Sequence, residues 1–301
     1  MNIEDINTFL VLVERKSFTK AANFLCISQS ALSHRLNLLE AEIGETLIVR
    51  NRGKREFYLT QAGADFIPLA EQWIALEKDT KRFKSTRRVH SISVSNVETL
   101  TQIFGSLYKQ FTISFKDEYP FLFHTYAYPS FYIINEVENQ NIDIGFVVRQ
   151  RISRSLKIEP IFAEKHFLLG ALGSDKKIID PRTLDPHMEL VTDWCSTYLP
   201  WHEWYFGSDN SPFAVVDTAT SAIEFLTEGT WCIVPQCAIE FLKTSVALRG
   251  VELQTYEIPN PPPDRICYKV THRFPNANRR ESVKFFEKKL ITYLKEKDLH
   301  L

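Results

Sequence analysis

Residues 17–43, SFTKAANFLCISQSALSHRLNLLEAEI, contain two helix starts in quick succession. Ser17 stands before Phe18–Leu25 and Ser28 before a longer run from Gln29, and serine is a preferred N-cap. The apolar stripe of the longer run consists of Leu32, Leu36, Leu39 and Ile43. This three- and four-residue spacing predicts a short helix followed by a longer amphipathic one.

The flanking residues complete a small domain. Upstream, a helical stripe is formed by Ile3, Ile6, Phe9, Leu10 and Val13. Downstream, Leu47–Arg50 and Glu56–Leu59 are typical of two short strands around the basic tip at residues 51–55. Three helices and a basic hairpin predict a winged helix-turn-helix over residues 1–60.

The outward face of the longer helix carries short polar side chains near its start. A helix that enters the major groove needs such side chains for base edges and cations for phosphates. A merely solvated polar face is the alternative, but the basic wing favours DNA. The candidate DNA-binding residues are Ser28, Gln29, Ser30, Ser33, His34 and Arg35 on the helix, and Arg50, Arg52, Lys54 and Arg55 in the wing.

A third pattern covers residues 61–88. Thr60 is a natural N-cap, and helical spacing continues along the segment, with Phe66, Trp73 and Leu76 on one apolar stripe. Pro68 removes one backbone donor and predicts a kink. The sequence therefore predicts a long linker helix.

From residue 89 the pattern changes to α/β. Alternating elements of this kind predict parallel sheets whose ligands bind at the carboxyl ends of the strands. The expected strands are Ser91–Val94, Phe121–Tyr126, Ile142–Val148, His166–Ala171, Glu189–Val191, Ala214–Val216 and Cys232–Val234. The expected helices are Thr99–Glu118, Phe131–Gln140, Ser221–Glu228 and Val283–Leu294.

The N-terminal residues resemble the LysR-type transcriptional regulators over about 60 positions. The matching motifs are Ser17-Phe18-Thr19-Lys20-Ala21-Ala22, Ser28-Gln29-Ser30-Ala31-Leu32-Ser33, Leu39-Glu40, Ile43-Gly44 and Leu59-Thr60-Gln61-Ala62-Gly63. Ile48, where the family usually has Phe, departs from the pattern.

The resemblance implies an effector-binding domain over 89–301 with two lobes of periplasmic-binding-protein type. Lobe one would hold about 90–161 and 266–301, and lobe two about 162–265. It also implies that the linker helix pairs with its twin through Phe66, Trp73 and Leu76, giving a homotetramer built as a dimer of dimers. The alternative is a helix packed on its own domain. The implied partners are double-stranded DNA, a small-molecule effector and RNA polymerase.

The same resemblance places an effector between the lobes. The candidate effector-binding residues are Ser95, Asn96, Thr99, Ser130 and Phe146 in lobe one, and Thr192, Trp194, Thr218, Trp231 and Pro235 in lobe two. Because these positions hold hydroxyls and few cations, we expect a small organic acid met by dipoles rather than by a salt bridge. No cofactor or metal is expected.

Composition sets the remaining bounds. Residues 1–88 hold 14 Lys/Arg and 11 Asp/Glu, a net of +3, so the rest of this chain of net charge −1 carries −4. We expect a cytoplasmic protein, because no apolar run approaches the roughly 20 residues of a membrane span and the first residues do not resemble a signal peptide.

Three other classes of protein are the alternatives. No nucleophile-elbow, Walker or HExxH motif points to an enzyme. A transport-type binding protein would not need the basic wing, although a non-catalytic small-molecule binder stays an alternative. The five scattered cysteines leave a thiol-redox regulator open, with Cys195 as the candidate.

Overall fold

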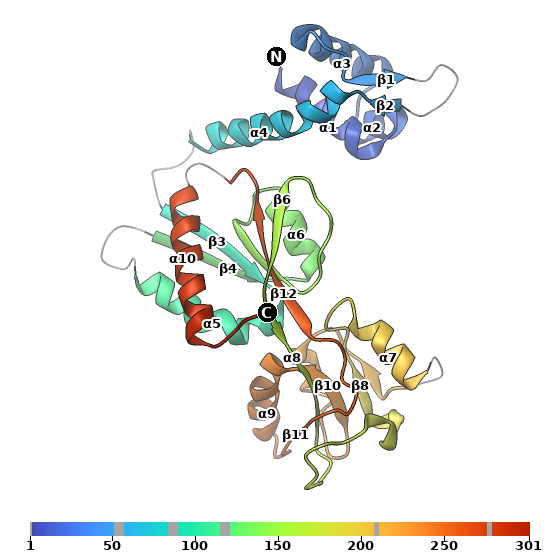
Figure 1. Cartoon of the computed structure of the whole chain (residues 1–301), viewed down its shortest axis with the longest axis vertical. Coiled ribbons are helices and arrows are strands. Elements are labelled where there is room, and N and C mark those ends of the chain that lie inside the picture. Colours follow the sequence, from blue (N-terminus) through green and yellow to red (C-terminus); the bar gives the residue numbers. More distant parts are fainter. Residues whose placement is uncertain (1, 51–56, 84–89, 115–120, 208–210, 276–278) are drawn as a thin grey trace. The chain divides into compact units, whose positions relative to one another are not determined.

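The computed structural model describes residues 2–50, 57–83, 90–114, 121–207, 211–275 and 279–301. The chain forms two compact units, which Figure 1 colours along the sequence. The first unit holds Met1–Arg88 with Phe274–Asn278, and the second holds Val89–Arg273 with Arg279–Leu301. Each unit is described by itself.

The first unit is a three-helix domain with a two-stranded wing and a long helix. Its elements are α1 (Ile3–Arg15), α2 (Phe18–Phe24), α3 (Gln29–Ile43), β1 (Ile48–Arg50), β2 (Phe57–Leu59) and α4 (Gln61–Phe83). Both serine caps are confirmed, because the Ser17 hydroxyl accepts from the Lys20 N–H and the Ser28 hydroxyl from the Ala31 N–H. Thr60 caps α4 through its hydroxyl, which accepts from the Gly63 N–H at 2.9 Å.

The expected stripes form the core of this unit. Its buried members come from all four helices and the start of the wing: Ile6, Phe9, Val11, Leu12, Ala21, Ala22, Leu32, Leu36, Leu39, Leu47, Ile48, Phe66, Ile67 and Ala70. Gly63 marks the tightest approach, since a Cβ there would lie 2.2 Å from the Leu47 carbonyl oxygen. Only glycine lets α4 pack so closely against the start of the wing.

The second unit contains two five-stranded sheets. In the first, β3 (His90–Asn96), β4 (Phe121–Ala127) and β5 (Ile144–Val147) are parallel, while β12 (Arg265–His272) is antiparallel to both β5 and β6 (Leu156–Glu164). The strand order is β4-β3-β5-β12-β6.

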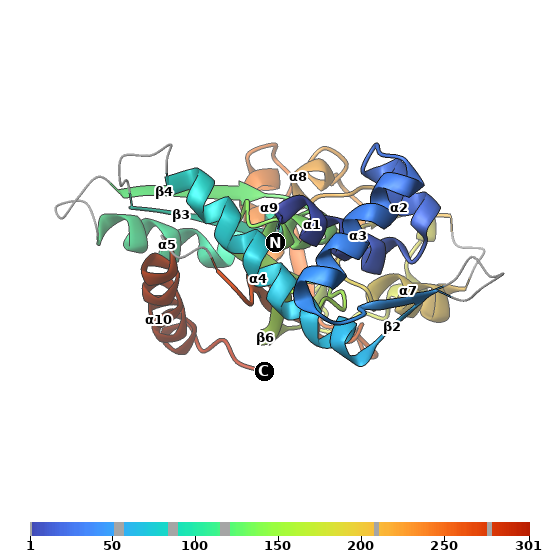
Figure 2. The same ribbon diagram turned by 90° about the horizontal axis from the view of Figure 1, so that it is seen from above.

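Helices cover both faces of this sheet. α5 (Thr101–Ile113), which follows the short 3₁₀ turn η1 (Glu98–Leu100), lies with α10 (Arg280–Glu296) on one side of β3 and β4, as Figure 2 shows. Their Phe104 and Phe286 pack around Phe146, and α6 (Ser130–Glu138) buries Ile133 and Val137 with Val147 instead. Since Phe146 and Val147 are neighbours on one strand, the two groups occupy opposite faces.

The second sheet has the order β11-β7-β10-β8-β9. Its strands are β7 (His166–Gly170), β8 (Glu189–Val191), β9 (Ala214–Val215), β10 (Trp231–Pro235) and β11 (Gln254–Tyr256). Its helices are α7 (Tyr198–Phe206), α8 (Ala219–Ala222) and α9 (Ile239–Ala247), with 3₁₀ turns η2 (Pro181–Thr183), η3 (Pro186–Met188) and η4 (Gln236–Ala238). Figure 1 shows α7 and α9 on opposite sides of β8 and β10.

One expectation about the sheets is wrong, because neither is purely parallel. β7 runs antiparallel to both β10 and β11, and β12 runs antiparallel to its two neighbours. The chain crosses between the sheets at β6–β7 and returns through β12, and β7 and β12 are the strands that run in the opposite direction, whereas β6 runs parallel to β5. Strands β6 and β11 and helices α7 and α9 were not expected, and residues 115–118 of the expected helix lie outside the described residues.

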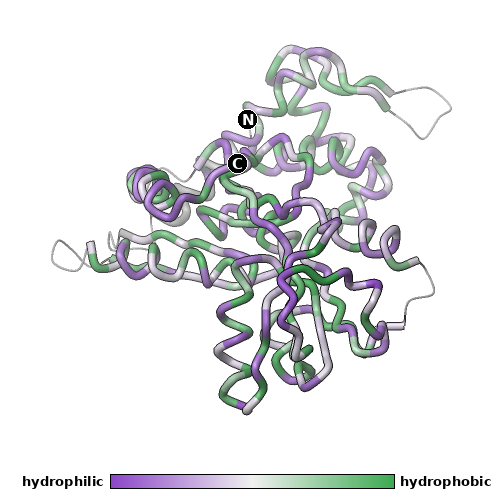
Figure 3. Tube along the Cα trace, turned by 60° about the horizontal axis from the view of Figure 1, so that its bottom comes forward, coloured by the Kyte–Doolittle hydropathy of each residue, from purple (hydrophilic) through white to green (hydrophobic). Residues whose placement is uncertain are grey.

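The hydropathy pattern follows this layering. Figure 3 shows hydrophilic and hydrophobic stretches alternating along the helices, as expected where one helical face is buried. One buried apolar cluster includes residues of both sheets of the second unit, among them Ile92, Phe146, Leu168 and Ile233. None of the described helices is long and apolar enough to span a membrane.

Candidate functional site

The candidate DNA-contacting surface lies at the start of α3. Ser28, Gln29, Ser30 and His34 are exposed, and Ser33 and Arg35 are half-buried. Leu32, Leu36 and Leu39 on the opposite face are buried, which fixes the direction of the polar face. The structure therefore gathers all six expected helix residues on one continuous surface.

Gln29 and Arg35 of this surface contact neighbouring helices of the unit. The Gln29 amide donates to the Thr19 hydroxyl at 2.9 Å, which links α3 to α2. The Arg35 guanidinium lies 2.6 Å from the Glu4 carboxylate on α1. Glu4 therefore orients the Arg35 side chain and compensates part of its charge. Helical spacing alone did not predict this ion pair.

The wing is joined to this surface through α3. The Glu40 carboxylate accepts from the backbone N–H groups of Leu47 and Ile48, at 2.7 and 3.0 Å, so the end of α3 fixes the start of β1. Arg50 belongs to β1, whereas Arg52, Lys54 and Arg55 lie outside the described residues. Their role in DNA binding stays a prediction.

The apolar stripe of α4 needs one correction. Phe66 is buried in the core of the unit, 5.5 Å from the Phe9 ring between centroids, and is unavailable for a seam with another chain. Trp73 and Leu76 are 46% and 64% exposed. Leu69, 56% exposed, lies one turn before Trp73 and takes the place that Phe66 was expected to fill.

A cavity of about 220 Å³ opens in the second unit, where strands of both sheets end. Its lining comes from six separate segments of the chain: Val97, Glu98, Thr99, Ala127, Tyr128, Pro129, Ser130, Val148, Arg149, Asp193, Trp194, Asp217, Thr218 and Arg265. Four expected effector-binding residues are among them, namely Thr99, Ser130, Trp194 and Thr218. The cavity therefore lies where the open α/β sheets were expected to present a ligand site.

Ser95, Asn96 and Phe146 of the first lobe do not line this cavity. All three are buried in the sheet. The Ser95 hydroxyl donates to the Tyr126 carbonyl, and the Asn96 side chain donates to the Thr101 hydroxyl at 2.8 Å. The two polar side chains therefore form hydrogen bonds within the protein, and none of the three residues lines the cavity.

Thr192, Trp231 and Pro235 of the second lobe are also buried and absent from the lining. The Trp231 indole N–H donates to the Asp185 carbonyl at 3.0 Å, within the second lobe. Trp194 does reach the cavity, and its indole N–H donates to the Ile233 carbonyl at 2.6 Å. That bond fixes the ring at the cavity wall.

The cavity carries charges that sequence reasoning missed. Arg265, at the first residue of β12, is buried and donates from Nε to the Glu164 carboxylate at 2.8 Å. It also donates from Nη1 to the Thr99 hydroxyl and from Nη2 to the Cys237 thiol, both at 3.1 Å. The lining thus holds a cation that the expected effector-binding positions did not include, while the way in which an effector's charge is met stays a prediction. The available signal was an arginine at the first residue of a partly buried strand.

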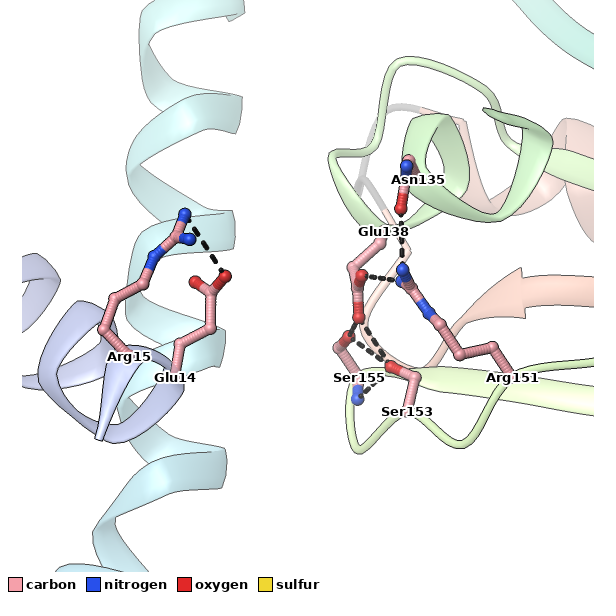
Figure 4. A network of polar contacts seen from close by, with 7 residues as sticks. All are labelled: Glu14, Arg15, Asn135, Glu138, Arg151, Ser153 and Ser155. Carbon is pink, nitrogen blue, oxygen red and sulfur yellow. Dashed lines mark hydrogen bonds and ion pairs between the residues drawn. The ribbon is translucent and has the colours of Figure 1, made fainter. Parts of the chain in front are cut away.

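A second ion pair joins Arg149 to Asp193 across the cavity lining. The loop that follows Arg149 is held by α6, as Figure 4 shows. The Glu138 carboxylate accepts from the hydroxyls of Ser153 and Ser155, at 2.6 and 2.8 Å, and pairs with Arg151. This network anchors one wall of the cavity to the first lobe.

The described thiols differ in exposure. Cys26 is exposed, whereas Cys195, Cys232 and Cys267 are buried. Burial raises the pKa of Cys237 to about 12 and raises the pKa values of Cys232 and Cys267 as well. These three thiols stay protonated near neutral pH and are weak nucleophiles. Among the described residues no cluster of three or more His, Cys, Asp or Glu side chains is suited to a metal ion.

Comparisons with known proteins match both units. The family model of the bacterial regulatory helix-turn-helix proteins, lysR family, matches residues 3–64. A probable RuBisCO transcriptional regulator of Thalassiosira pseudonana is 26% identical over 171 residues, 56% of this chain and 55% of that protein. The uncharacterized regulator YcgK of Bacillus subtilis is 36% identical over 115 residues, 37% of this chain and 35% of YcgK. The matches thus span about half, or less, of these relatives.

Solved structures match over nearly the whole chain. Full-length OxyR from Pseudomonas aeruginosa has a TM-score of 0.54 at 14% identity, covering 96% of this chain and 94% of that one. Full-length LysG from Corynebacterium glutamicum, solved with bound effector Arg, has a TM-score of 0.54 at 16% identity, covering 98% and 99%. At these identities the likeness concerns the fold. Residues 3–64 thus match the lysR-family helix-turn-helix by sequence, and the chain is similar in fold to these full-length proteins along nearly its whole length.

Proposed function

We propose that this protein is a sequence-specific DNA-binding transcriptional regulator whose activity is controlled by a small molecule bound in the cavity of its second unit. The observation that carries the proposal is the lysR-family helix-turn-helix at residues 3–64, whose α3 presents a continuous exposed polar face. A helix of this kind places its N-terminal side chains against base edges in the major groove. It would act in the cytoplasm, where bacterial DNA is accessible.

The proposed effector site is the 220 Å³ cavity between the two lobes. Its volume lies below the roughly 300–1,000 Å³ of drug-sized ligand sites, which favours a small metabolite. The organic acid expected from the sequence would place its carboxylate at the wall formed by Thr99, Ser130 and Arg265. Binding would favour one lobe arrangement and so shift the population of DNA-binding states.

The proposed assembly is a homodimer through α4, with two dimers forming a tetramer that contacts RNA polymerase. The exposed Trp73 and Leu76 support such a seam. Trp73→Glu should separate the pair and lower operator affinity, because two half-sites would no longer be held by one particle. Sedimentation of the unmodified protein as a monomer at micromolar concentration would contradict the assembly.

The deciding experiment is capture of random genomic DNA fragments by the full-length protein, followed by sequencing. A recurrent motif is the expected result, and uniform recovery would remove the regulator function. A thermal-shift screen of small metabolites then tests the effector site. Thr99→Ala with Ser130→Ala should abolish the response to a hit while leaving DNA binding intact, and unchanged affinity in calorimetry would place the site elsewhere.

A thiol-redox regulator of the same fold is the second candidate. The buried, high-pKa thiols of Cys232, Cys237 and Cys267 disfavour it. Peroxide treatment followed by thiol counting is the matching test, with Cys195→Ser as the variant. A non-catalytic binder without DNA affinity would show the thermal-shift hit and no captured motif.

A further inference from the structure

Glu98 joins the two lobes at the cavity. It follows β3 in the first lobe, on the short turn η1. Its carboxylate accepts from the backbone N–H of Ala219 at 3.0 Å and of Thr220 at 3.1 Å, and from the Thr220 hydroxyl. Both acceptor oxygens are thus engaged by α8 of the second lobe.

The donors at α8 have no partner within their own helix. The first N–H groups of a helix lack intrahelical acceptors. The N-cap hydroxyl of Thr218 accepts from Ser221 and leaves Ala219 and Thr220 unserved. Glu98 therefore supplies, from the other lobe, the acceptor to which these two N–H groups donate in place of water or a ligand.

The other charged residues of the cavity lining leave an excess of negative charge near α8. The lining holds the carboxylates of Glu98, Asp193 and Asp217 against the guanidiniums of Arg149 and Arg265. Both guanidinium groups are already paired with carboxylates: Arg149 with Asp193, and Arg265 with Glu164, which does not line the cavity. The Asp217 carboxylate, in contrast, is exposed and accepts from the Ser221 hydroxyl at 3.3 Å. Negative charge is in excess on the side of the cavity nearest α8.

A further part of the cavity wall, formed by residues of the first lobe, offers hydrogen-bond donors. Ser130 accepts from the Val148 N–H, so its hydroxyl keeps its own proton to donate, whereas Thr99 accepts from Arg265 and is also hydrogen-bonded to the Cys237 thiol. Arg265 directs its Nη1 toward the same wall. An acceptor group on a ligand finds its donors here, in the first lobe.

We infer that Glu98 determines ligand specificity: it fills the second-lobe donors with the protein's own carboxylate and selects a ligand that is an amino-acid-like zwitterion. The ligand's ammonium group faces Glu98 and Asp217, and its carboxylate faces Thr99, Ser130 and Arg265. Dianions are excluded, because their second carboxylate would face two carboxylates. This inference rests on the proposed effector site and narrows the expected organic acid to one that also carries an amine.

The test uses matched probes that differ by one group. Succinate and glutarate become β-alanine and 4-aminobutyrate when one carboxylate is replaced by an ammonium. Affinity of the full-length protein for all four is measured by calorimetry, for the unmodified chain and for Glu98→Gln, Asp217→Asn and Glu281→Gln. Glu281 is an exposed residue in the first turn of α10, away from the cavity, and serves as the matched control.

The unmodified chain should prefer the zwitterion of each pair by at least about tenfold. Glu98→Gln should reduce that ratio by about tenfold, Asp217→Asn by less, and Glu281→Gln should leave it unchanged. Amide exchange adds a readout independent of any ligand: the peptide holding Ala219 and Thr220 should exchange faster in Glu98→Gln only. Because Asp217 is exposed, its variant keeps the test valid if Glu98→Gln fails to fold.

A dianion preference in the unmodified chain, or a ratio that Glu98→Gln leaves unchanged, would overturn the inference. So would failure of all four compounds to bind. DNA capture by the same preparations separates these results from failure of the proposed function, since a chain that binds its motif but ignores the charge of the probe refutes only the role of Glu98.

Discussion

The α3 surface and the cavity of the second unit depend on different features of the sequence. The α3 surface takes its six candidate residues from positions 28–35 of one helix. The cavity takes its lining from six segments spread between Val97 and Arg265. A local surface follows from helical periodicity and a cap, whereas the cavity depends on which strands become neighbours.

The two regions also hold their charges differently. At the α3 surface, Arg35 forms an ion pair with Glu4 of α1, and both side chains are exposed enough for water to solvate their charges. At the cavity, Arg265 and Glu164 are 1% and 5% exposed and depend on each other. Surface ion pairs contribute little to stability, but removal of one partner of a buried ion pair leaves the other charge buried without compensation. Perturbing each region should therefore have very different costs.

The largest expected effect is at the buried pair. Arg265→Leu should lower the free energy of unfolding by about 3–5 kcal/mol, because it leaves the Glu164 carboxylate buried without its partner. Urea unfolding followed by circular dichroism measures this. The double variant Glu164→Leu/Arg265→Leu should recover most of the loss. If the single variant is as stable as the unmodified chain, water replaces the guanidinium and the ion pair is not isolated from solvent.

Arg265 also shows where prediction from sequence stopped. Its partner Glu164 is 101 residues away along the chain, and no local pattern links the two. The caps Ser17, Ser28 and Thr60 were predictable because their partners lie three residues ahead. Helix α7 was missed because its aromatic residues and Pro200 obscure helical periodicity, although proline is tolerated in a first turn.

The second effect depends on pH and belongs to the second lobe. Burial, and then the neighbouring Arg265 guanidinium, lower the pKa of His166 to about 3. Below its ordinary pKa of about 6.5 the unfolded chain binds a proton at this side chain and the folded chain does not. The stability due to this difference is complete above pH about 6.5 and is lost as the pH falls toward about 3.

Between pH 6.5 and 4.5 the free energy of unfolding should fall by about 2 kcal/mol more in the unmodified chain than in His166→Gln. Urea unfolding at several pH values measures the difference. His300→Gln, at an exposed position, is the control and should follow the unmodified chain. Parallel curves for all three proteins would mean that His166 becomes protonated in the folded state.

The third effect is at the DNA-contacting surface and leaves stability almost unchanged. Ser33→Ala and Arg35→Ala should each weaken binding to the captured motif by about 1–3 kcal/mol if the side chain contacts a base. Glu4→Gln distinguishes contact from positioning, because it releases Arg35 without removing it. Fluorescence anisotropy with the motif and a scrambled duplex gives both affinities. Equal losses on the two duplexes would reassign Arg35 to phosphate contact.

The smallest expected effect tests how local the α3 surface is. The Ser28 hydroxyl accepts from the Ala31 N–H at 3.1 Å, and the Ser17 hydroxyl accepts from the Lys20 N–H at 3.4 Å. Ser28→Ala should therefore cost about 1 kcal/mol in the unfolding of the first unit, as is typical for a lost N-cap. Ser17→Ala should cost less, because its longer hydrogen bond is the weaker one. Amide exchange resolved by peptide is the right measurement, since the two units can unfold separately. Exchange in α3 should accelerate while the strands around the cavity keep their protection. Acceleration in those strands would show that the α3 surface and the cavity of the second unit belong to one cooperative unit.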